Sequence, residues 1–367
     1  MSRAVVPSID PEAAAFVRAR EAEGASLKSA VLEYAAVRRG LPVQRWSESL
    51  VTLRTPAGTL SFSNMNGPSC TVVGRQFCDQ KQVTHACLHQ AGLSVPAYGA
   101  FAPHDEAAAL AFAHELGPPV VVKPNSASRG RAVTTGIYDV DAFRQAWAKA
   151  VSVIERRPGG CVVVERHVLG DDYRCFVLDG RLVSATRRLR AHVVGNGRND
   201  VAALIAAKNQ LRERNPYLHR YPIPDDLALL DALHEAGLDL DHVPLAGAHV
   251  TLRSTSNLAT GGDSVDVTDV IHASFREVAI RALQAIPGMR YGGVDLLAQD
   301  ITAPARPDNH VVSEVEYSPG PGPFFPVQGI PRDIAGAVLD SYCAVDATVD
   351  HALRPDGVRS IGGSSGE

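Results

Sequence analysis

Three carboxylates towards the C-terminal end of the chain have the spacing of a cation-binding site. Glu314 and Glu316 lie two residues apart in what reads as a buried strand, HVVSEVEY, so both side chains would project from one face. Asp295 lies in a second such run, YGGVDLLAQD, and antiparallel pairing of the two runs would bring it near the glutamates. Because converging acids repel one another, we expect a cation between them, and oxygen ligands favour Mg2+ or Mn2+. The alternative is a solvent-facing strand whose acids pair with arginines.

A second stretch combines a lysine with a loop of small and polar residues, as in a phosphate-binding loop. In VVVKPNSASRGRAVTTG, a strand ends at Lys123 and opens into a loop before the next strand. Small residues allow backbone N–H groups to approach an anion, and the lysine adds a positive charge. The loop lacks the GxxxxGK[ST] pattern of a Walker A motif. The other interpretation is a surface hairpin with a solvated lysine.

A third stretch, VVVERHVLGDDYRCFV, has the features of a linker that could bind a nucleotide base. Glu165 ends a strand of buried character, and the linker of Arg166, His167 and Val168 that follows offers backbone donors and acceptors to a base edge. Asp172 is far enough along the chain to reach a ribose hydroxyl. The alternative is a strand end with a turn and solvated acids.

The composition is that of a folded, soluble protein of two or three domains. Of 367 residues, 45% are hydrophobic, and the net charge of -4 gives no basic excess, so we expect no nucleic-acid partner. The six cysteines form no CxxC pair, and no run resembles a signal peptide or a membrane span. We therefore expect reduced thiols, no membrane partner and a cytoplasmic location. His85 and His89, four apart in a predicted helix, are expected to be solvated on its surface rather than to bind a metal.

Helices and antiparallel hairpins are mixed along the chain, which predicts an α+β layer structure rather than a doubly wound parallel sheet. The helical periodicity covers 26–39, and later 105–117 and 141–154. A hairpin is predicted where the dipeptide DG interrupts YRCFVLDGRLVSATRR.

These motifs together, in this order, resemble the ATP-grasp ligases, and among them the ATP-grasp modules of cyanophycin synthetase and bifunctional glutathione synthetase. The resemblance runs from about residue 70 to 330, and its most specific block is LRSTSNLATGGDSVDVTDVIH, at 252–272. The runs RRLRAHVVGNG, ERHVLGDDYR, VVKP and SEVEYSPG support it. The resemblance implies an ATP-grasp fold, in which two α+β subdomains grip ATP. The expected organisation is an N-terminal α/β cap over 1–75, a subdomain with the phosphate-covering loop over 76–165, a subdomain with the metal site and a substrate insert over 166–352, and a disordered tail over 353–367.

The resemblance also implies roles for individual residues. ATP phosphates would be bound by Lys81 and Lys123 and covered by a flap that includes Ser126, Ser128, Arg129 and Gly130. The nucleoside would contact Glu165, Arg166, Val168 and Asp172, and Asp295, Glu314 and Glu316 fall on metal-ligand positions. The transferred phosphoryl group or the acyl phosphate would face Arg174, Arg188 and Arg253, with N–H groups from Gly261 and Gly262. One departure is that the family usually reads E-x-N where this chain has Glu316.

The implied function is an ATP-dependent ligase that joins an amino-acid carboxylate, such as glutamate or a γ-glutamyl donor, to an amine. An acyl phosphate would be the intermediate, ADP and phosphate the other products, and two Mg2+ ions are expected, with Mn2+ as a substitute. Small-molecule amino acids would be the substrates, and a homo-oligomer is expected. Lys123→Ala is expected to lower turnover drastically without unfolding the chain. The alternatives are a kinase that acts on a small metabolite, or a nucleotide-binding regulatory protein that has lost the reaction.

Overall fold

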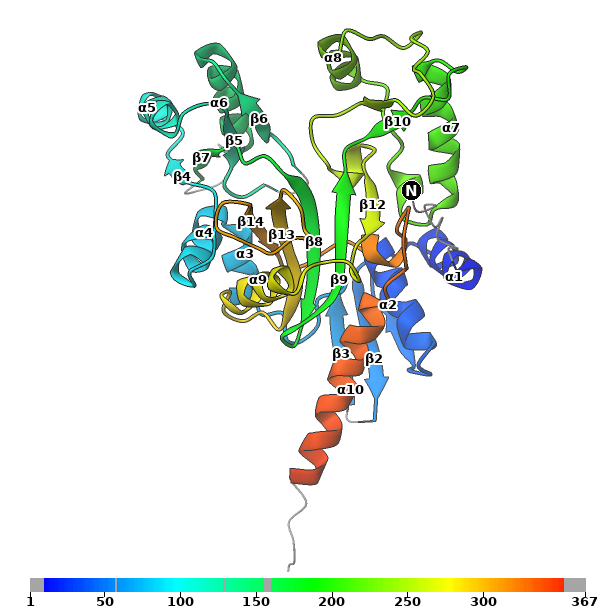
Figure 1. The fold of residues 1–367 in the computed structure, drawn as a ribbon. Coiled ribbons are helices and arrows are strands. Elements are labelled where there is room, and N and C mark those ends of the chain that lie inside the picture. Colours follow the sequence, from blue (N-terminus) through cyan, green and yellow to red (C-terminus); the bar gives the residue numbers. More distant parts are fainter. Residues whose placement is uncertain (1–9, 57, 128–129, 155–159, 353–367) are drawn as a thin grey trace, which may run out of the picture.

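The computed structural model describes residues 10–56, 58–127, 130–154 and 160–352, with side chains described up to residue 344. Ser128, Arg129 and the tail over 353–367 therefore lie outside the described residues. Two lobes rise on either side of a central antiparallel sheet, and the N-terminal elements and the last helix lie below and beside it (Figure 1). The predicted α+β layer structure is confirmed.

The N-terminal elements form a small layer of helices on a three-stranded sheet. The helices are α1 (Pro11–Ala22) and α2 (Leu27–Val37), and the antiparallel strands are β1 (Val43–Arg45), β2 (Leu50–Thr55) and β3 (Gly58–Ser63). The last helix, α10 (Ile334–Ala352), packs against α2. Leu32 and Val51 of this cap share one hydrophobic core with Phe176 and Tyr291 of the central sheet. The hydroxyl of Tyr291 also donates a hydrogen bond to the carbonyl of Met65 at 2.8 Å, so the cap is joined to the sheet by a buried contact.

The first lobe is a four-stranded antiparallel sheet with helices packed on it. Its strand order is β4 (Tyr98–Phe101), β7 (Val162–Arg166), β5 (Val120–Pro124) and β6 (Thr134–Ile137). The helices are α5 (Glu106–Leu116) and α6 (Val140–Ile154), and the core between them and the sheet includes Phe143 and Trp147. The apolar run at 120–124 is buried throughout, as its composition predicts.

The central sheet has five antiparallel strands and positions most of the predicted site. Its strand order is β12 (Asp263–Asp266), β9 (Arg181–Leu189), β8 (Asp171–Leu178), β13 (Tyr291–Ala298) and β14 (His310–Glu316). The helix α9 (Ala273–Gln284) contacts β8, β9 and β13, and α3 (Val72–Asp79) and α4 (Lys81–Gln90) contact β14. The predicted hairpin is confirmed, since Asp179 and Gly180 between β8 and β9 both have positive φ, of 50° and 68°.

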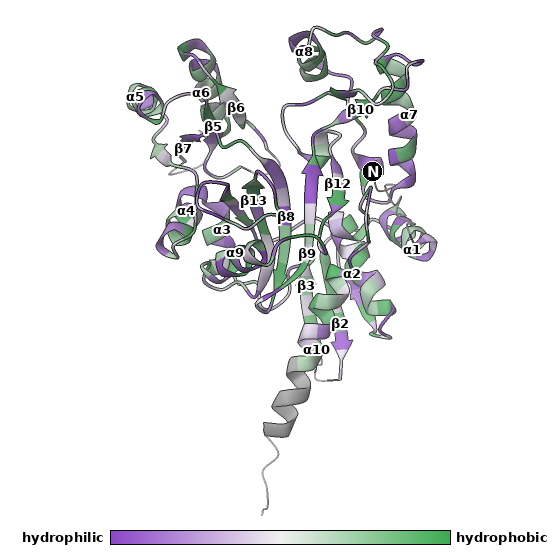
Figure 2. Cartoon of the chain, in the orientation of Figure 1, coloured by the Kyte–Doolittle hydropathy of each residue, from purple (hydrophilic) through white to green (hydrophobic). Residues whose placement is uncertain are grey.

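Alternation along β8 explains how one strand serves both a core and a site. Tyr173, Cys175 and Val177 point into the core with α9, whereas Phe176 points into the core shared with the cap. Arg174 alternates in step with Phe176, so its side chain emerges on the cap side of the sheet. Figure 2 shows hydrophobic residues along the central strands and hydrophilic residues at the end of β9 that leads to β10.

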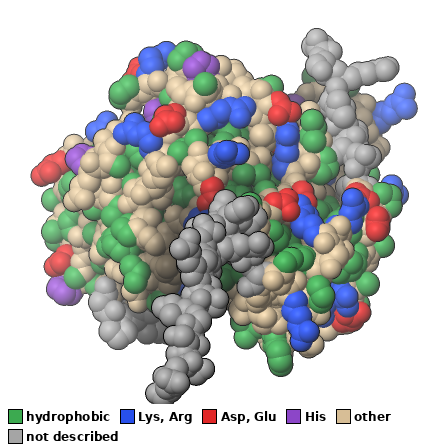
Figure 3. All heavy atoms as spheres, turned by 90° about the horizontal axis from the view of Figure 1, so that it is seen from below, with side chains coloured by type: hydrophobic (Ala, Val, Ile, Leu, Met, Phe, Trp, Pro, Cys, Tyr) green, Lys and Arg blue, Asp and Glu red, His purple; other side chains and the backbone are tan. Residues whose placement is uncertain are grey.

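The second lobe is an insert between β9 and β12. It contains β10 (His192–Val194), α7 (Val201–Arg214), η1 (Leu218–Arg220), α8 (Leu227–Glu235), β11 (His249–Thr251) and η2 (Leu258–Thr260). A small core of its own holds it together, with Leu229, Leu233 and Leu252 among its members. Seen from below, acidic and basic side chains are interspersed on the surface (Figure 3). Among the described residues, every helix is too short or too polar to span a bilayer.

Candidate functional site

The three predicted metal-ligand carboxylates lie on adjacent strands, as the sequence predicted. β13 and β14 pair antiparallel, with Asp295 opposite Glu314 and Gly293 opposite Glu316. On its other side Asp295 lies opposite Arg174 of β8. Cross-strand partners point to the same face of a sheet, so the acids share a face with this arginine.

Asp295 is held between two arginines. It is 3% exposed, and the guanidinium of Arg174 binds both of its oxygens, at 2.7 and 2.8 Å. Arg188 Nη2 donates to Asp295 Oδ2 at 2.8 Å, and Arg188 Nε donates to Asp172 at 3.0 Å. The Ser256 hydroxyl donates to Asp172 and extends the chain of polar contacts. Burial alone would raise the pKa of Asp295, but Arg174 and Arg188 lower it to about 2, so the carboxylate stays ionised.

Glu314 has a lysine partner, whereas Glu316 accepts a hydrogen bond from a backbone N–H group. Lys81 Nζ, at the start of α4, lies 3.0 Å from Glu314 Oε1. Glu316 Oε1 accepts a hydrogen bond from the backbone N–H of Ser318 at 3.1 Å. Burial raises the pKa of Glu316, and Glu314 raises it further, although Arg174 opposes this effect. The two neighbouring glutamates therefore differ in how their charge is balanced.

In this conformation, arginine and lysine side chains supply the positive charges beside Asp295 and Glu314. Asp295 pairs with arginines and Glu314 with a lysine, which is the partner chemistry of the alternative interpretation, although Asp295 is buried rather than solvent-facing. Among the described residues, no three acidic, histidine or cysteine side chains are arranged to hold one ion. The metal-ligand assignment therefore stays a prediction.

The predicted phosphate lysines lie on both sides of the loop after β5. Lys123 is 6% exposed, and its Nζ lies 2.7 Å from Glu165 Oε1 across the sheet. Lys81 Nζ donates to the carbonyl of Ala127 at 3.0 Å as well as to Glu314, so this residue connects the loop of the first lobe to β14. Lys123 is therefore not the solvated surface residue that the hairpin alternative assumed. Two buried cations next to one loop fit an anionic ligand.

The strand end at Glu165 carries two buried polar atoms that could bind a ligand. Glu165 Oε2 and His167 Nδ1 are both buried and have no hydrogen-bond partner among the described residues. Such atoms are rare in proteins and are expected where a ligand completes the hydrogen bonding. The linker itself runs past Val168, which is half-buried, while the Arg166 guanidinium donates to the carbonyl of Leu116 at 2.8 Å. Arg166 therefore anchors the linker to the end of α5 through its side chain.

The other described residues predicted to contact the nucleotide are Asp172, in the central sheet, and Ser126 and Gly130, in the loop after β5. Asp172 lies in the central sheet, where it already binds Arg188 and Ser256, so a ribose contact would compete with these partners. Ser126 is half-buried in the loop after β5, and Gly130 has a φ of 70°, a backbone conformation that favours glycine. Their contacts with a nucleotide remain predictions.

In this conformation the N–H groups of Gly261 and Gly262, which were predicted to face an anion, take part in a turn, so that role stays a prediction. Their N–H groups donate to the carbonyls of Leu258 and Asn257, at 3.4 and 3.1 Å, inside the turn that ends η2. Close packing explains the glycines instead. A Cβ on Gly261, whose φ is 94°, would lie 2.8 Å from the Ile223 side chain, and one on Gly262 would meet backbone oxygen at 2.7 Å.

The side chain of Arg253 binds residues of the insert. It is 5% exposed, and its Nη1 lies 2.7 Å from Asp226 Oδ1 while Nη2 donates to the Pro224 carbonyl at 3.1 Å. These partners belong to the segment before α8. Of the three predicted basic residues, the structure brings Arg174 and Arg188 together at Asp295, whereas Arg253 pairs with Asp226 of the insert.

Sequence reasoning missed Arg212, whose guanidinium binds the carbonyls of the turn at Gly261 and Gly262. This residue of α7 is 3% exposed, and its Nη1 donates to the carbonyls of Gly261 and Gly262 at 3.0 Å and to Asp263 at 2.7 Å. Lys208, four residues earlier on the helix, also pairs with Asp263 at 2.6 Å. A basic pair at helical spacing was the available clue, but its acidic partner lies about fifty residues away in sequence.

We expect Arg212→Met to destabilise the insert, because it removes the donors that Arg212 gives to four backbone carbonyls and to the buried Asp263 carboxylate. The expected loss is about 3 kcal/mol in the free energy of unfolding, the lower end for breaking a buried ion pair, since Lys208 remains. Urea unfolding followed by circular dichroism measures it. Arg214→Met, at an exposed position of the same helix, is the matched control. Equal unfolding midpoints for the two variants would contradict the role given to Arg212.

The expectation of solvated histidines is wrong for His85. His89 is exposed, but His85 is fully buried and its Nε2 lies 3.0 Å from the carbonyl oxygen of Ser313 on β14. The reason is that α4 packs against β14, so one face of this helix is interior. Burial lowers the pKa of His85, which favours the neutral ring.

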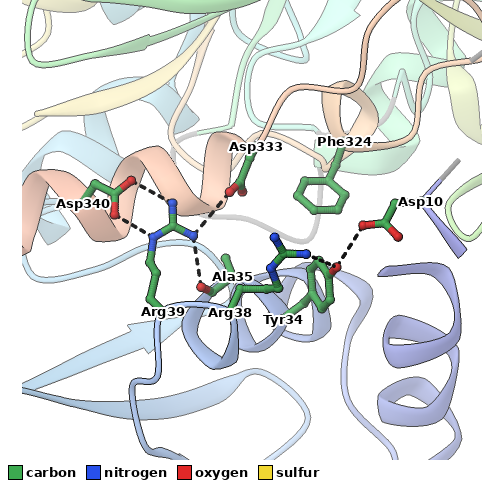
Figure 4. Close-up of a pocket in the computed structure, with 8 residues that line it drawn as sticks. All are labelled: Asp10, Tyr34, Ala35, Arg38, Arg39, Phe324, Asp333 and Asp340. Atoms are coloured by element: carbon green, nitrogen blue, oxygen red, sulfur yellow. Dashed lines mark hydrogen bonds and ion pairs between the residues drawn. The ribbon is translucent and has the colours of Figure 1, made fainter. Parts of the chain in front are cut away.

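A cavity of about 520 Å³ between α2 and the start of α10 is lined by none of the predicted site residues (Figure 4). Arg39 binds both oxygens of Asp340, at 2.6 and 2.7 Å, and lies 3.4 Å from Asp333. The Tyr34 hydroxyl donates to Asp10 at 3.0 Å. The ion pairs of Arg39 join the cap to the start of the last helix, whereas the contact of Tyr34 with Asp10 lies within the cap.

Comparison with known proteins identifies relatives that match most of this chain. No protein-family model matches the chain. Cyanophycin synthetase from a Nostoc species is 33% identical over 323 residues, which cover 86% of this chain and 35% of that protein. The glutathione biosynthesis bifunctional protein of Mannheimia succiniciproducens is 33% identical over 305 residues, covering 80% of this chain and 39% of that protein. The chain thus spans little more than a third of the length of these relatives.

A solved structure decides the fold. The crystal structure of a bifunctional glutathione synthetase from Pasteurella multocida matches 86% of this chain and 43% of its own, with a TM-score of 0.63 and 27% identity. The chain has the ATP-grasp fold. The resemblance to cyanophycin synthetase and bifunctional glutathione synthetase is therefore confirmed. In this ATP-grasp chain, the four-stranded lobe and the central sheet are the two layers that meet at the contact between Lys81 and Glu314.

Proposed function

We propose that this ATP-grasp chain is an ATP-dependent carboxylate–amine ligase that releases ADP. The observation that carries the proposal is a set of lysine–glutamate ion pairs where the four-stranded sheet meets the central sheet. There Lys81 contacts both the loop after β5 and Glu314, and Lys123 lies buried beside Glu165. The homologues and the shared fold support the same chemistry.

The residues at the first lobe fit a nucleotide. Lys81 and Lys123 would hold its phosphates, and the loop that begins at Ser126 would cover them. Within the part of the chain that the structure describes, Glu165 Oε2 and His167 Nδ1 are buried without partners, which supports further hydrogen bonds to a ligand there. The linker through Val168 would bind the base.

The acids of the central sheet fit a hard divalent cation. Asp295, Glu314 and Glu316 supply only oxygen donors, which suits Mg2+, and two ions are expected with Mn2+ as a substitute. A cation held there would help ATP to supply an electrophilic phosphoryl group for a substrate carboxylate. Lys81 would then have to share or leave its contact with Glu314, because a cation and a lysine compete for one carboxylate.

The substrate would be an amino-acid carboxylate, with glutamate or a γ-glutamyl compound as the preferred class. Arg174 and Arg188, next to Asp295, would stabilise negative charge on the phosphorylated carboxylate until an amine attacks it. The acyl phosphate would thus be the intermediate. Positioning and charge stabilisation suffice for this chemistry, since no protein side chain needs to form a covalent bond.

Two other functions share the nucleotide site. A kinase would differ only in its acceptor, and a regulatory protein would bind ATP without turnover. Both lysines and all three acids are present, which favours an active enzyme over a regulatory protein.

The test is phosphate release from Mg·ATP in the presence of pools of amino acids and γ-glutamyl compounds, with hydroxylamine added to trap an acyl phosphate. A ligase is expected to give ADP, free phosphate and a hydroxamate. Formation of ADP and a phosphorylated product without free phosphate or hydroxamate would point to a kinase. Nucleotide binding without product would leave the regulatory function.

A further inference from the structure

The N-terminal cap contributes a lysine to the turn that follows the acidic strand. Lys28, in the first turn of α2, donates a hydrogen bond to the carbonyl oxygen of Ser318 and another to its Oγ at 3.0 Å. Ser318 in turn donates its backbone N–H to Glu316 Oε1 at 3.1 Å. A cation from the cap thus holds the residue that orients the Glu316 carboxylate.

The environment of Glu316 differs from that of its two acidic neighbours. Asp295 and Glu314 have guanidinium or ammonium nitrogens at 2.7 and 3.0 Å. Within the described ranges, no lysine or arginine nitrogen lies within 4.0 Å of the Glu316 carboxylate. Its orientation therefore depends on the turn at Ser318, and the turn is held by Lys28.

The cap is fixed well enough to act on this turn. Leu32, one helical turn beyond Lys28, is fully buried in the core that also contains Phe176 and Tyr291 of the central sheet. The hydrogen bond from Tyr291 to the Met65 carbonyl adds a second attachment. The lysine is therefore carried by a helix that is packed on the sheet bearing the acids.

We propose that Lys28 is a positioning residue for the nucleotide site, acting through Ser318 on the carboxylate of Glu316. The inference rests on the proposed function only in taking Glu316 as a ligand of a metal–nucleotide complex. It makes the cap a part of the site, although none of the site residues that the motifs predicted lies in the cap.

The test is the affinity of the full chain for Mn2+ with AMP-PNP, an ATP analogue that is not hydrolysed, measured by isothermal titration calorimetry. Lys28→Met is expected to weaken binding about tenfold, or ~1.4 kcal/mol, which is typical for losing hydrogen bonds from a charged donor. Arg54→Met, which removes an exposed basic residue from β2 of the same cap, is the matched control and should leave the affinity unchanged. Unchanged binding by Lys28→Met would overturn the proposal. Tighter binding would overturn it too, because it would mean that Lys28 acts on the metal site only through repulsion between its charge and the cation.

A double-mutant cycle separates positioning from a merely structural role. In a Glu316→Gln background, Lys28→Met is expected to change the affinity less than about twofold, because residues that act through one another are not additive. A full tenfold loss in that background would overturn the proposal. If Lys28→Met does not fold, the same cycle is run with Lys28→Gln, with the same expected loss of additivity.

This readout separates the inference from the ligase proposal. Binding of Mn2+ and AMP-PNP needs no ligation, so a positive cycle in a chain that forms no amide would retain the role of Lys28 and reject the ligase. Ligation with an additive cycle would retain the ligase and reject the role of Lys28. Failure of the unmodified chain to bind the metal–nucleotide complex would reject both.

Discussion

Lys123→Ala is expected to abolish most ATP-dependent turnover and also to destabilise the chain. The loss of a buried phosphate-binding cation should lower kcat about 100- to 1,000-fold. The same change leaves Glu165, which is 7% exposed, as a buried charge without its partner at 2.7 Å. Breaking such a pair costs about 3 to 5 kcal/mol. The expectation of lost turnover without unfolding, drawn from the sequence, therefore needs revision.

A double variant separates the two effects. Lys123→Met combined with Glu165→Gln removes both charges and keeps the side-chain volumes, so much of the stability should return while turnover stays low. Stability is measured by urea unfolding and turnover by phosphate release. A folded Lys123→Ala chain that retains ligation would contradict the role of Lys123. Failure of the double variant to recover stability would contradict the ion-pair explanation.

Asp295→Asn is expected to have the second large effect, on both folding and activity. The substitution leaves Arg174 and Arg188 facing each other without the carboxylate that binds both. We expect a loss of about 3 to 5 kcal/mol in the free energy of unfolding and turnover below detection. Asp308→Asn, an exposed acid in the loop after β13, is the control and should behave as the unmodified chain.

The stability difference between the unmodified chain and Asp295→Asn should depend on pH in a defined direction. The pKa of Asp295 is lowered from 3.8 to about 2 by its arginines, so the folded state binds this proton less readily than the unfolded state. The stabilisation is therefore fully present above pH 3.8 and shrinks as the pH falls towards 2. Urea midpoints measured from pH 7 downwards test this. A difference that grows on acidification would contradict the ion-pair arrangement.

Local patterns were sufficient for most of the elements that carry the site. The pairing of β13 with β14 followed from two apolar runs with acids at a two-residue spacing, because side chains alternate along a strand. The hairpin at Asp179 and Gly180 followed from a dipeptide that tolerates positive φ. The helices α1 and α3 were missed. In α1 few positions are buried, so the apolar periodicity is weak, although Asp10 caps it and Pro11 begins it.

Partners distant in sequence were the main source of error. His85 was expected to be solvated, because a helix does not reveal which strand will cover it, and β14 covers this one. Gly261 and Gly262 suggested available N–H groups, but the turn uses them and Arg212 binds their carbonyls from another helix. Spacing along the chain contains no information on such contacts.

The amino-acid sequence was enough to place the acids on one face, the lysines next to a loop of small residues, and the motifs in the order of the ATP-grasp fold. Residue type and the two-residue period of strands are local properties, which explains why these predictions succeeded. Tertiary structure alone decided which cation meets which acid, with Arg174 and Arg188 at Asp295, Lys81 at Glu314, and a cap lysine near Glu316. These pairings depend on how separate layers pack, because charges far apart in sequence interact only once the core has brought their strands and helices together.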